Sequence, residues 1–168
     1  MLKRLLLSAV AIGLASPSFA AVTPNSLVTT QTPKRGLYQF TSASTPASGT
    51  TTNAQTVYTA GSNGSKCFAV YMSNTDGSAT HVVNYGVYDS THYVTLGGTT
   101  TVSPGTGGVT GVPVVQNLLT STLSPGTPVD GNGNPFIYLN SGDTLVAWYV
   151  TAITSNDFVN VYADCQDF

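Results

Sequence analysis

Two histidines, His81 and His92, are the side chains of this sequence best suited to general-base chemistry near neutral pH. A serine hydrolase also needs its nucleophile in a sharp turn, but the run from Ser141 to Leu145 lacks a G-x-S-x-G elbow. Both histidines stand in segments rich in threonine and tyrosine, where a solvated or hydrogen-bonded histidine is the common outcome. The seven aspartates lie in or beside predicted turns, so no carboxylate pair is distinguished for glycoside hydrolysis. We therefore predict no catalytic residues and no enzymatic activity.

Oxygen-bearing side chains at Asp130, Asn132 and Asn134 alternate in the way that calcium loops require. A loop of the EF-hand type also needs a glutamate at its twelfth position, which is Ser141 here. Aspartate, asparagine and glycine are equally the residues of an ordinary turn. These three residues are thus a calcium candidate with a plain turn as the alternative, and we predict neither a metal nor another cofactor.

Aromatic side chains offer a second kind of chemistry. The chain has nine tyrosines and a single tryptophan, Trp148. On an exposed sheet face such rings give broad contact at a low entropic cost, which suits the stacking of sugars. Packing in the core explains most of them equally well. Trp148 is our candidate glycan contact.

The two cysteines, Cys67 and Cys165, are the whole thiol inventory. In an oxidising compartment such a pair is more often a disulfide than two free thiols, so we predict a bridge. Zinc is disfavoured because His81 and His92 lack the paired spacing of zinc sites.

The first twenty residues have the plan of a secretory signal peptide. Lys3 and Arg4 precede an apolar stretch, and small residues follow it. We place cleavage after Ala20, with one position later as the alternative. A transmembrane anchor would need about 20 apolar residues, and this run is shorter. We therefore expect export to the periplasm, the cell surface or the medium.

The mature chain is acidic, with three cations, Lys34, Arg35 and Lys66, against seven aspartates and no glutamate. Three dispersed cations offer no patch to phosphates. Nucleic acid and, after signal cleavage, membranes are therefore excluded as expected partners.

The segments that carry the candidate residues are predicted to be β structure, because threonine, valine and tyrosine favour strands and glycine favours turns. Residues 21–35 lack periodicity and predict an extended arm, followed by one domain over residues 36–168. Val114 to Ser121 is the only window with a possible helical turn. The runs from Lys66 to Leu96 predict a meander of adjacent strands. We expect about eight strands: Gly36 to Thr41, Gln55 to Ala60, Lys66 to Ser73, Thr80 to Asp89, His92 to Leu96, Phe136 to Leu139, Asp143 to Ala152 and Asp157 to Cys165.

Eight strands with long Thr/Ser/Gly loops favour an all-β, antiparallel sandwich of jelly-roll type, with a barrel as the second choice. One domain of this length can bury roughly 70% of its unfolded surface.

The order of turn motifs resembles that of small structural proteins of tailed bacteriophages and prophages. The motifs span nearly all of the mature region: Ala21 to Leu27, Gln31 to Gly36, Tyr58 to Lys66, Ser73 to His81, Pro125 to Asp130, Gly133 to Pro135, Ser141 to Leu145, and Asp167 with Phe168. The resemblance implies a non-enzymatic β-sandwich that assembles on a particle. Virion proteins assemble in the cytoplasm and need no signal peptide and seldom a disulfide, so we expect a host-exported relative.

Two functions follow as expectations. The first is an exported structural module that associates with itself or assembles on a larger particle or surface. The second is a secreted surface module that binds glycans through exposed aromatic side chains, with Trp148 as the named contact.

Overall fold

The computed structural model describes residues 31–47, 53–97, 100–102 and 112–168. The predicted signal peptide and residues 21–30 of the predicted arm lie outside this part of the chain. Within it, all regular structure is β, and no helix is present that could cross a membrane. The strands are β1 (Thr32–Thr41), β2 (Gln55–Thr59), β3 (Ser65–Asn74), β4 (His81–Tyr88), β5 (Tyr93–Thr95), β6 (Thr100–Val102), β7 (Val114–Asn117), β8 (Ile137–Leu139), β9 (Thr144–Tyr149) and β10 (Phe158–Asp167).

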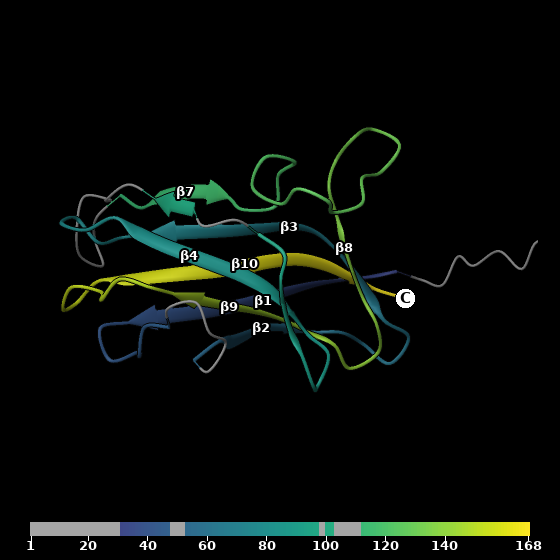
Figure 1. The fold of residues 1–168 in the computed structure, drawn as a ribbon, viewed down its shortest axis with the longest axis horizontal. Coiled ribbons are helices and arrows are strands. Elements are labelled where there is room, and N and C mark those ends of the chain that lie inside the picture. Colours follow the sequence, from purple (N-terminus) through teal and green to yellow (C-terminus); the bar gives the residue numbers. More distant parts are fainter. Residues whose placement is uncertain (1–30, 48–52, 98–99, 103–111) are drawn as a thin grey trace, which may run out of the picture.

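The strands form two antiparallel sheets stacked as in a sandwich (Figure 1). Sheet A has the order β1-β10-β3-β7, and β8 also pairs with β3. Sheet B has the order β2-β9-β4-β5, and β6 also pairs with β4. The two sheets share one apolar core, so the prediction of an all-β, sandwich-like domain is confirmed at this level.

Alternation along β10 shows why the sheets stack. Val159, Val161 and Ala163 are buried at every second position, as a strand with one face on a core requires. From the neighbouring strand β1, Phe40 enters the same core and meets Tyr149 of sheet B, with ring centroids 4.9 Å apart. Aromatic contact between the sheets thus adds to the burial of aliphatic side chains.

The meander predicted from Lys66 to Leu96 is wrong in its first half. β3 lies in sheet A and β4 in sheet B, so the turn between them crosses from one sheet to the other. The reason is that both strands carry a buried apolar face, with Met72 on β3 and Tyr85 on β4, and opposite sheets let these faces meet. The second half, the hairpin of β4 and β5, does form.

Most strand boundaries differ from the prediction by a few residues, and three differences are larger. β1 begins at Thr32 rather than Gly36, because it pairs with β10 along its whole length, and the predicted arm loses its last four residues to this strand. The window that allowed a helical turn contains β7, which pairs with residues 71–74 of β3. The short strand β6 was not predicted at all.

Gly36 marks the corner where the edge strands of the two sheets meet. A Cβ atom on Gly36 would lie 2.2 Å from the carbonyl oxygen of Val57 and 2.6 Å from the Cβ of Tyr58. Backbone cannot move aside as a flexible side chain does. The close approach of β1 and β2 therefore requires glycine at this position.

We expect Gly36→Ala to lower the free energy of unfolding by about 2 kcal/mol, because overpacking forces the two strands apart. Urea denaturation would measure it. Gly131→Ala is the matched control, since no atom lies within 4 Å of a Cβ there and the change should stay below about 0.5 kcal/mol. Equal stabilities for the two variants would contradict a glycine-dependent corner.

Candidate functional site

The outer face of sheet A brings together side chains that lie far apart in the sequence. Strand pairing places Arg35 of β1 opposite Asp164 of β10, and Asp164 opposite Ala69 of β3. In the next outward row Tyr162 lies opposite Tyr71, and their rings stack with centroids 5.1 Å apart. Directly paired residues in antiparallel strands point to the same face, so these side chains share one surface.

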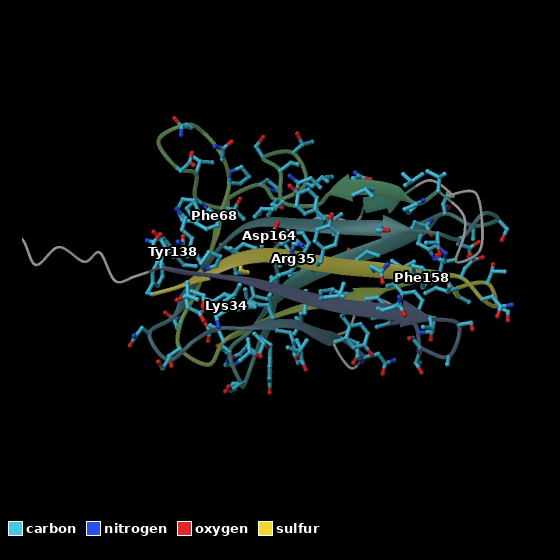
Figure 2. All side chains as sticks on the ribbon, turned by 180° about the vertical axis from the view of Figure 1, so that it is seen from behind. Lys34, Arg35, Phe68, Tyr138, Phe158 and Asp164 are labelled. Carbon is cyan, nitrogen blue, oxygen red and sulfur yellow. A yellow bond between two sulfur atoms is a disulfide. The ribbon has the colours of Figure 1, made fainter. Side chains whose placement is uncertain are left out.

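A β-bulge adds Phe68 to this surface. The register between β10 and β3 shifts, because Asp164 pairs with Ala69 while the next residue, Cys165, pairs with Cys67. Phe68 is therefore the extra residue on β3, and 45% of it is exposed. Bulges redirect side chains in this way, often beside functional sites. In Figure 2, Phe68 lies beside Asp164 and Arg35 on sheet A.

Cys67 and Cys165 form a disulfide directly below this surface, as predicted. Both are buried and face the core, one on each of the two paired strands that carry the bulge. The bridge thus ties β3 to β10 next to Phe68. A covalent link at this point keeps the register that exposes the ring.

Two hollows flank Phe68 and share it, together with Asp164, as part of their walls. The hollow toward β1 has a volume of about 440 Å³, and polar residues in its wall include Arg35 and Gln166. The hollow toward β7 has a volume of about 430 Å³. Its wall includes the small residue Ala69 and polar groups from β7 and from the loop before β8. The rest of its lining is Tyr71, Asn117, Leu119, Asp130, Asn134, Pro135 and Phe136.

Two cations of this surface, Arg35 and Lys66, lie beside a carboxylate or an aromatic ring. A third cation, Lys34, lines the hollow toward β1. Arg35 donates from Nε to an oxygen of Asp164 at 2.8 Å, in an exposed ion pair. The ammonium of Lys66 lies 3.9 Å from the ring centroid of Phe136 and 5.0 Å from that of Phe68. These cation–π contacts hold the loop after residue 129 against β3.

The predicted calcium residues form a closed turn at the border of the second hollow. One oxygen of Asp130 accepts from the backbone N–H groups of Asn132 and Asn134, each at 2.9 Å. The other oxygen accepts from the side-chain amide of Asn134 at 3.3 Å. The N–H of Asn134 holds the pKa of the Asp130 carboxyl below its ordinary value, and the charge of Lys66 acts in the same direction. Turn chemistry thus accounts for these residues, and calcium binding stays a hypothesis.

Trp148 does not lie on an exposed face, contrary to the premise on which it was predicted as a glycan contact. Its side chain is on the outer side of sheet B, but only 3% of the residue is exposed because Ala47, Ala54 and Tyr88 pack around it. Its indole N–H has no hydrogen-bond partner among the described residues. The indole is a packing element between sheet B and the segment that precedes β2.

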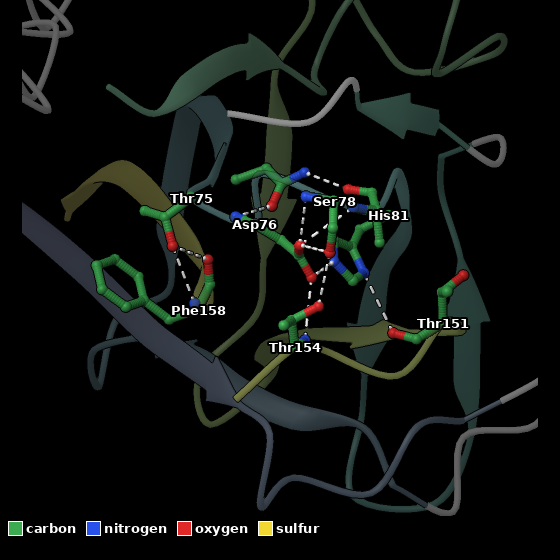
Figure 3. A network of polar contacts seen from close by, with 9 residues as sticks. Thr75, Asp76, Ser78, His81, Thr151, Thr154 and Phe158 are labelled. Carbon is green, nitrogen blue, oxygen red and sulfur yellow. Dashed lines mark hydrogen bonds and ion pairs between the residues drawn. The ribbon is translucent and has the colours of Figure 1, made fainter. Parts of the chain in front are cut away.

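His81 and Asp76 are fully buried members of a polar network that reaches exposed residues at its edge (Figure 3). One ring nitrogen bonds an oxygen of Asp76 at 3.0 Å, and the other bonds the carbonyl oxygen of Thr151 at 3.2 Å. Both ring nitrogens are therefore engaged within the network.

Asp76 is the centre of that network and accepts five hydrogen bonds. They come from Ser78, Ala79, His81 and the backbone N–H of Thr154. The hydroxyl of Ser78 bonds Asp76 and Thr154 rather than the imidazole, so it is not aligned as a nucleophile. The network joins the loop after β3 to the loop after β9.

The other residues considered for catalysis in the sequence are also held by local turns. His92 is exposed and lies 3.4 Å from Asp89 in the turn between β4 and β5. In the run from Ser141 to Leu145, Gly142 has a φ of +81°, and Asp143 accepts from the backbone N–H of Asn140 at 2.8 Å. His81 and His92 flank opposite ends of β4, so the structure does not bring them together.

Sequence reasoning missed Phe68, Tyr71, Tyr162 and Asp164 as candidate site residues. One signal was available in β10, where Asn160, Tyr162 and Asp164 alternate with small and aliphatic residues. Such alternation predicts one solvated face. The bulge that exposes Phe68 depends on the pairing of strands that lie far apart in the sequence, so no local sequence pattern predicts it.

No protein-family model matches this chain, and no curated protein is similar to it. The resemblance to phage structural proteins therefore stays a hypothesis. Function has to be argued from the geometry of the described residues.

Proposed function

We propose that the mature protein is an exported, non-enzymatic module that binds carbohydrate through the outer face of sheet A. The observation that carries this proposal is the exposed ring of Phe68 between two hollows whose walls hold polar side chains. We keep glycan binding as the proposed function, but we assign the aromatic ring that contacts the sugar to Phe68 instead of Trp148.

Carbohydrate fits this surface because a sugar ring has an apolar face of C–H groups and a rim of hydroxyls. The C–H face stacks on an exposed aromatic ring, which gives a large contact at a low entropic cost. The hydroxyls both donate and accept, which suits the amides of Asn117 and Gln166 and the carboxylate of Asp164. A few polar groups around an apolar surface are typical of small-ligand sites.

The strand order supports a jelly roll. β5 and β6 pair with two stretches of β4, and β7 and β8 with two stretches of β3. If each pair counts as one interrupted strand, eight strand positions result, four in each sheet. Jelly rolls of eight strands include both lectin and viral capsid domains. This architecture therefore suits glycan binding and particle assembly alike.

Export is supported by the signal-like N-terminal pattern and by the disulfide, since disulfides persist in oxidising compartments. Neither catalysis nor a cofactor enters the proposal.

Self-association or assembly on a larger particle is the second candidate. Large apolar side chains on sheet A, Leu37 with 62% and Tyr138 with 60% of their surface exposed, favour it. Exposed apolar patches often mark protein interfaces. Light scattering on the protein without glycan distinguishes this candidate, because it requires oligomers in the absence of any sugar.

Affinity electrophoresis in gels that contain cellulose, starch or mannan derivatives tests the proposal. We expect at least one polymer to retard the mature protein and Phe68→Ala to lose most of that retardation. Val94→Ala is the matched control, because Val94 is equally exposed but lies on sheet B. Retardation by no polymer, or an equal retardation of Phe68→Ala, would contradict carbohydrate binding at this face.

A further inference from the structure

We infer that the outer face of sheet A binds the interior of an uncharged polysaccharide chain, with one sugar on Phe68 and one in each flanking hollow. This inference rests on the proposed function and adds the ligand class and the smallest ligand that fills the site. It follows from the continuity of the hollows, the balance of their charges and the rigidity of the ring between them.

Continuity comes from shared walls. Phe68 and Asp164 line both hollows. A ligand that extends from one hollow to the other therefore crosses these two side chains. At about 440 and 430 Å³, each hollow falls in the lower part of the range of roughly 300 to 1,000 Å³ for small-molecule sites. Each thus has room for a sugar unit of its own.

Polar groups of different strands serve the two hollows. Gln166 of β10 lines the hollow toward β1, whereas Asn117 of β7 and Asn134 of the adjoining loop line the hollow toward β7. A chain that reaches both Gln166 and Asn117 must cross β3, because this strand lies between β10 and β7. Three consecutive sugars are the shortest ligand that contacts Phe68 and both sets of amides.

The charges of the surface cancel locally, which selects against a charged chain. Arg35 is paired with Asp164 at 2.8 Å. Lys34, which also lines the hollow toward β1, and Lys66 lie close enough to Asp167 and Asp130, respectively, to lower the pKa values of these carboxyls. An acidic sugar would have to displace Asp164 from Arg35, and a cationic sugar would have to displace Arg35 from Asp164. Neutral hydroxyls and amides bind without breaking these pairs.

Phe68 is held in place before any ligand arrives. Its bulge lies beside the disulfide of Cys67 and Cys165, and the ammonium of Lys66 lies over its ring. A fixed platform avoids the entropic cost of ordering a side chain on binding. The ring therefore acts as a central subsite rather than as a flexible cover.

Calorimetry with oligosaccharides of increasing length tests this inference. The probes are the mono- to hexasaccharides of cellulose, starch and mannan, with oligogalacturonates as the acidic series. We expect the affinity for one neutral series to rise at least about tenfold from mono- to trisaccharide and then level off, a change of about 1.4 kcal/mol. The oligogalacturonates should bind more weakly at every length.

Variants assign the subsites. Gln166→Ala removes the amide of the hollow toward β1, and the double variant Asn117→Ala/Asn134→Ala removes both amides of the hollow toward β7. In each case the gain on adding the third sugar should disappear while disaccharide binding remains. Leu37→Ala is the control, since this exposed residue of sheet A lines neither hollow and should leave the whole series unchanged. Near-ultraviolet circular dichroism checks that each variant is folded.

Equal affinities for the monosaccharide and the trisaccharide would overturn the three-subsite arrangement, and tighter binding of the oligogalacturonates would overturn the uncharged ligand. Both results leave carbohydrate binding itself in place. Binding of no sugar in any series would instead remove the proposed function together with the inference.

Discussion

Replacing Cys67 and Cys165 together with alanine should lower the free energy of unfolding by about 4 kcal/mol. The disulfide closes a loop with a sequence separation of 98 residues, and a cross-link of that span strongly restricts the unfolded chain. Chemical denaturation of both proteins under oxidising conditions would measure the difference.

Reductant supplies the control for this experiment. Wild-type protein that is unfolded and refolded in reductant should approach the stability of the double alanine variant, and the variant itself should not respond. Stability of the wild type that is the same with and without reductant would contradict a stabilising bridge. Intact-mass measurement would then show whether the two thiols were ever joined.

Asp76→Ala should lower the free energy of unfolding by about 3 kcal/mol, because each buried donor left without its acceptor costs about 1 to 3 kcal/mol. The carboxylate is fully buried and accepts five hydrogen bonds, so alanine leaves the ring of His81 and the backbone N–H of Thr154 without an acceptor. Asp89→Ala is the matched control. It also accepts from a neighbouring histidine and two backbone N–H groups, but it is exposed, so its loss should lower the stability far less than the loss of Asp76.

The same carboxylate makes stability depend on pH. Burial raises the pKa of Asp76, but hydrogen bonds from Thr154, Ser78 and His81 outweigh it and hold the pKa well below its ordinary value. The unfolded chain then binds more protons than the folded one, so stability is full above about pH 4 and falls as the pH drops below it. Urea midpoints measured across that interval should fall more steeply for the wild type than for Asp76→Ala. Parallel profiles would contradict this role.

The all-β class and the disulfide could be predicted from the sequence because both depend on residue type. Threonine, valine and tyrosine favour strands wherever they stand, and the two cysteines have only each other as partners within the chain. Most strand positions followed from the turns between them. The prediction of a meander was wrong because the turn residues at positions 74–77 do not determine whether the next strand pairs within the same sheet or crosses to the other one.

The candidate site could not be predicted in the same way because it depends on register. Trp148 and Phe68 are both aromatic residues in strands, yet one is covered by a preceding segment and the other is exposed by a bulge. The bulge exists only once β10 pairs with β3, far away along the chain. Arg35 and Asp164 likewise become neighbours only through the pairing of β1 with β10.

The central claim is that the outer face of sheet A binds carbohydrate, and an NMR titration of the isotope-labelled mature protein tests it most directly. On adding the oligosaccharide that binds best, we expect the largest amide shifts at Phe68, Ala69, Asn117 and Asp164, with β4 and β9 of sheet B unchanged. Shifts that gather on sheet B instead, or no shifts at saturating concentrations of any neutral oligosaccharide, would contradict the claim.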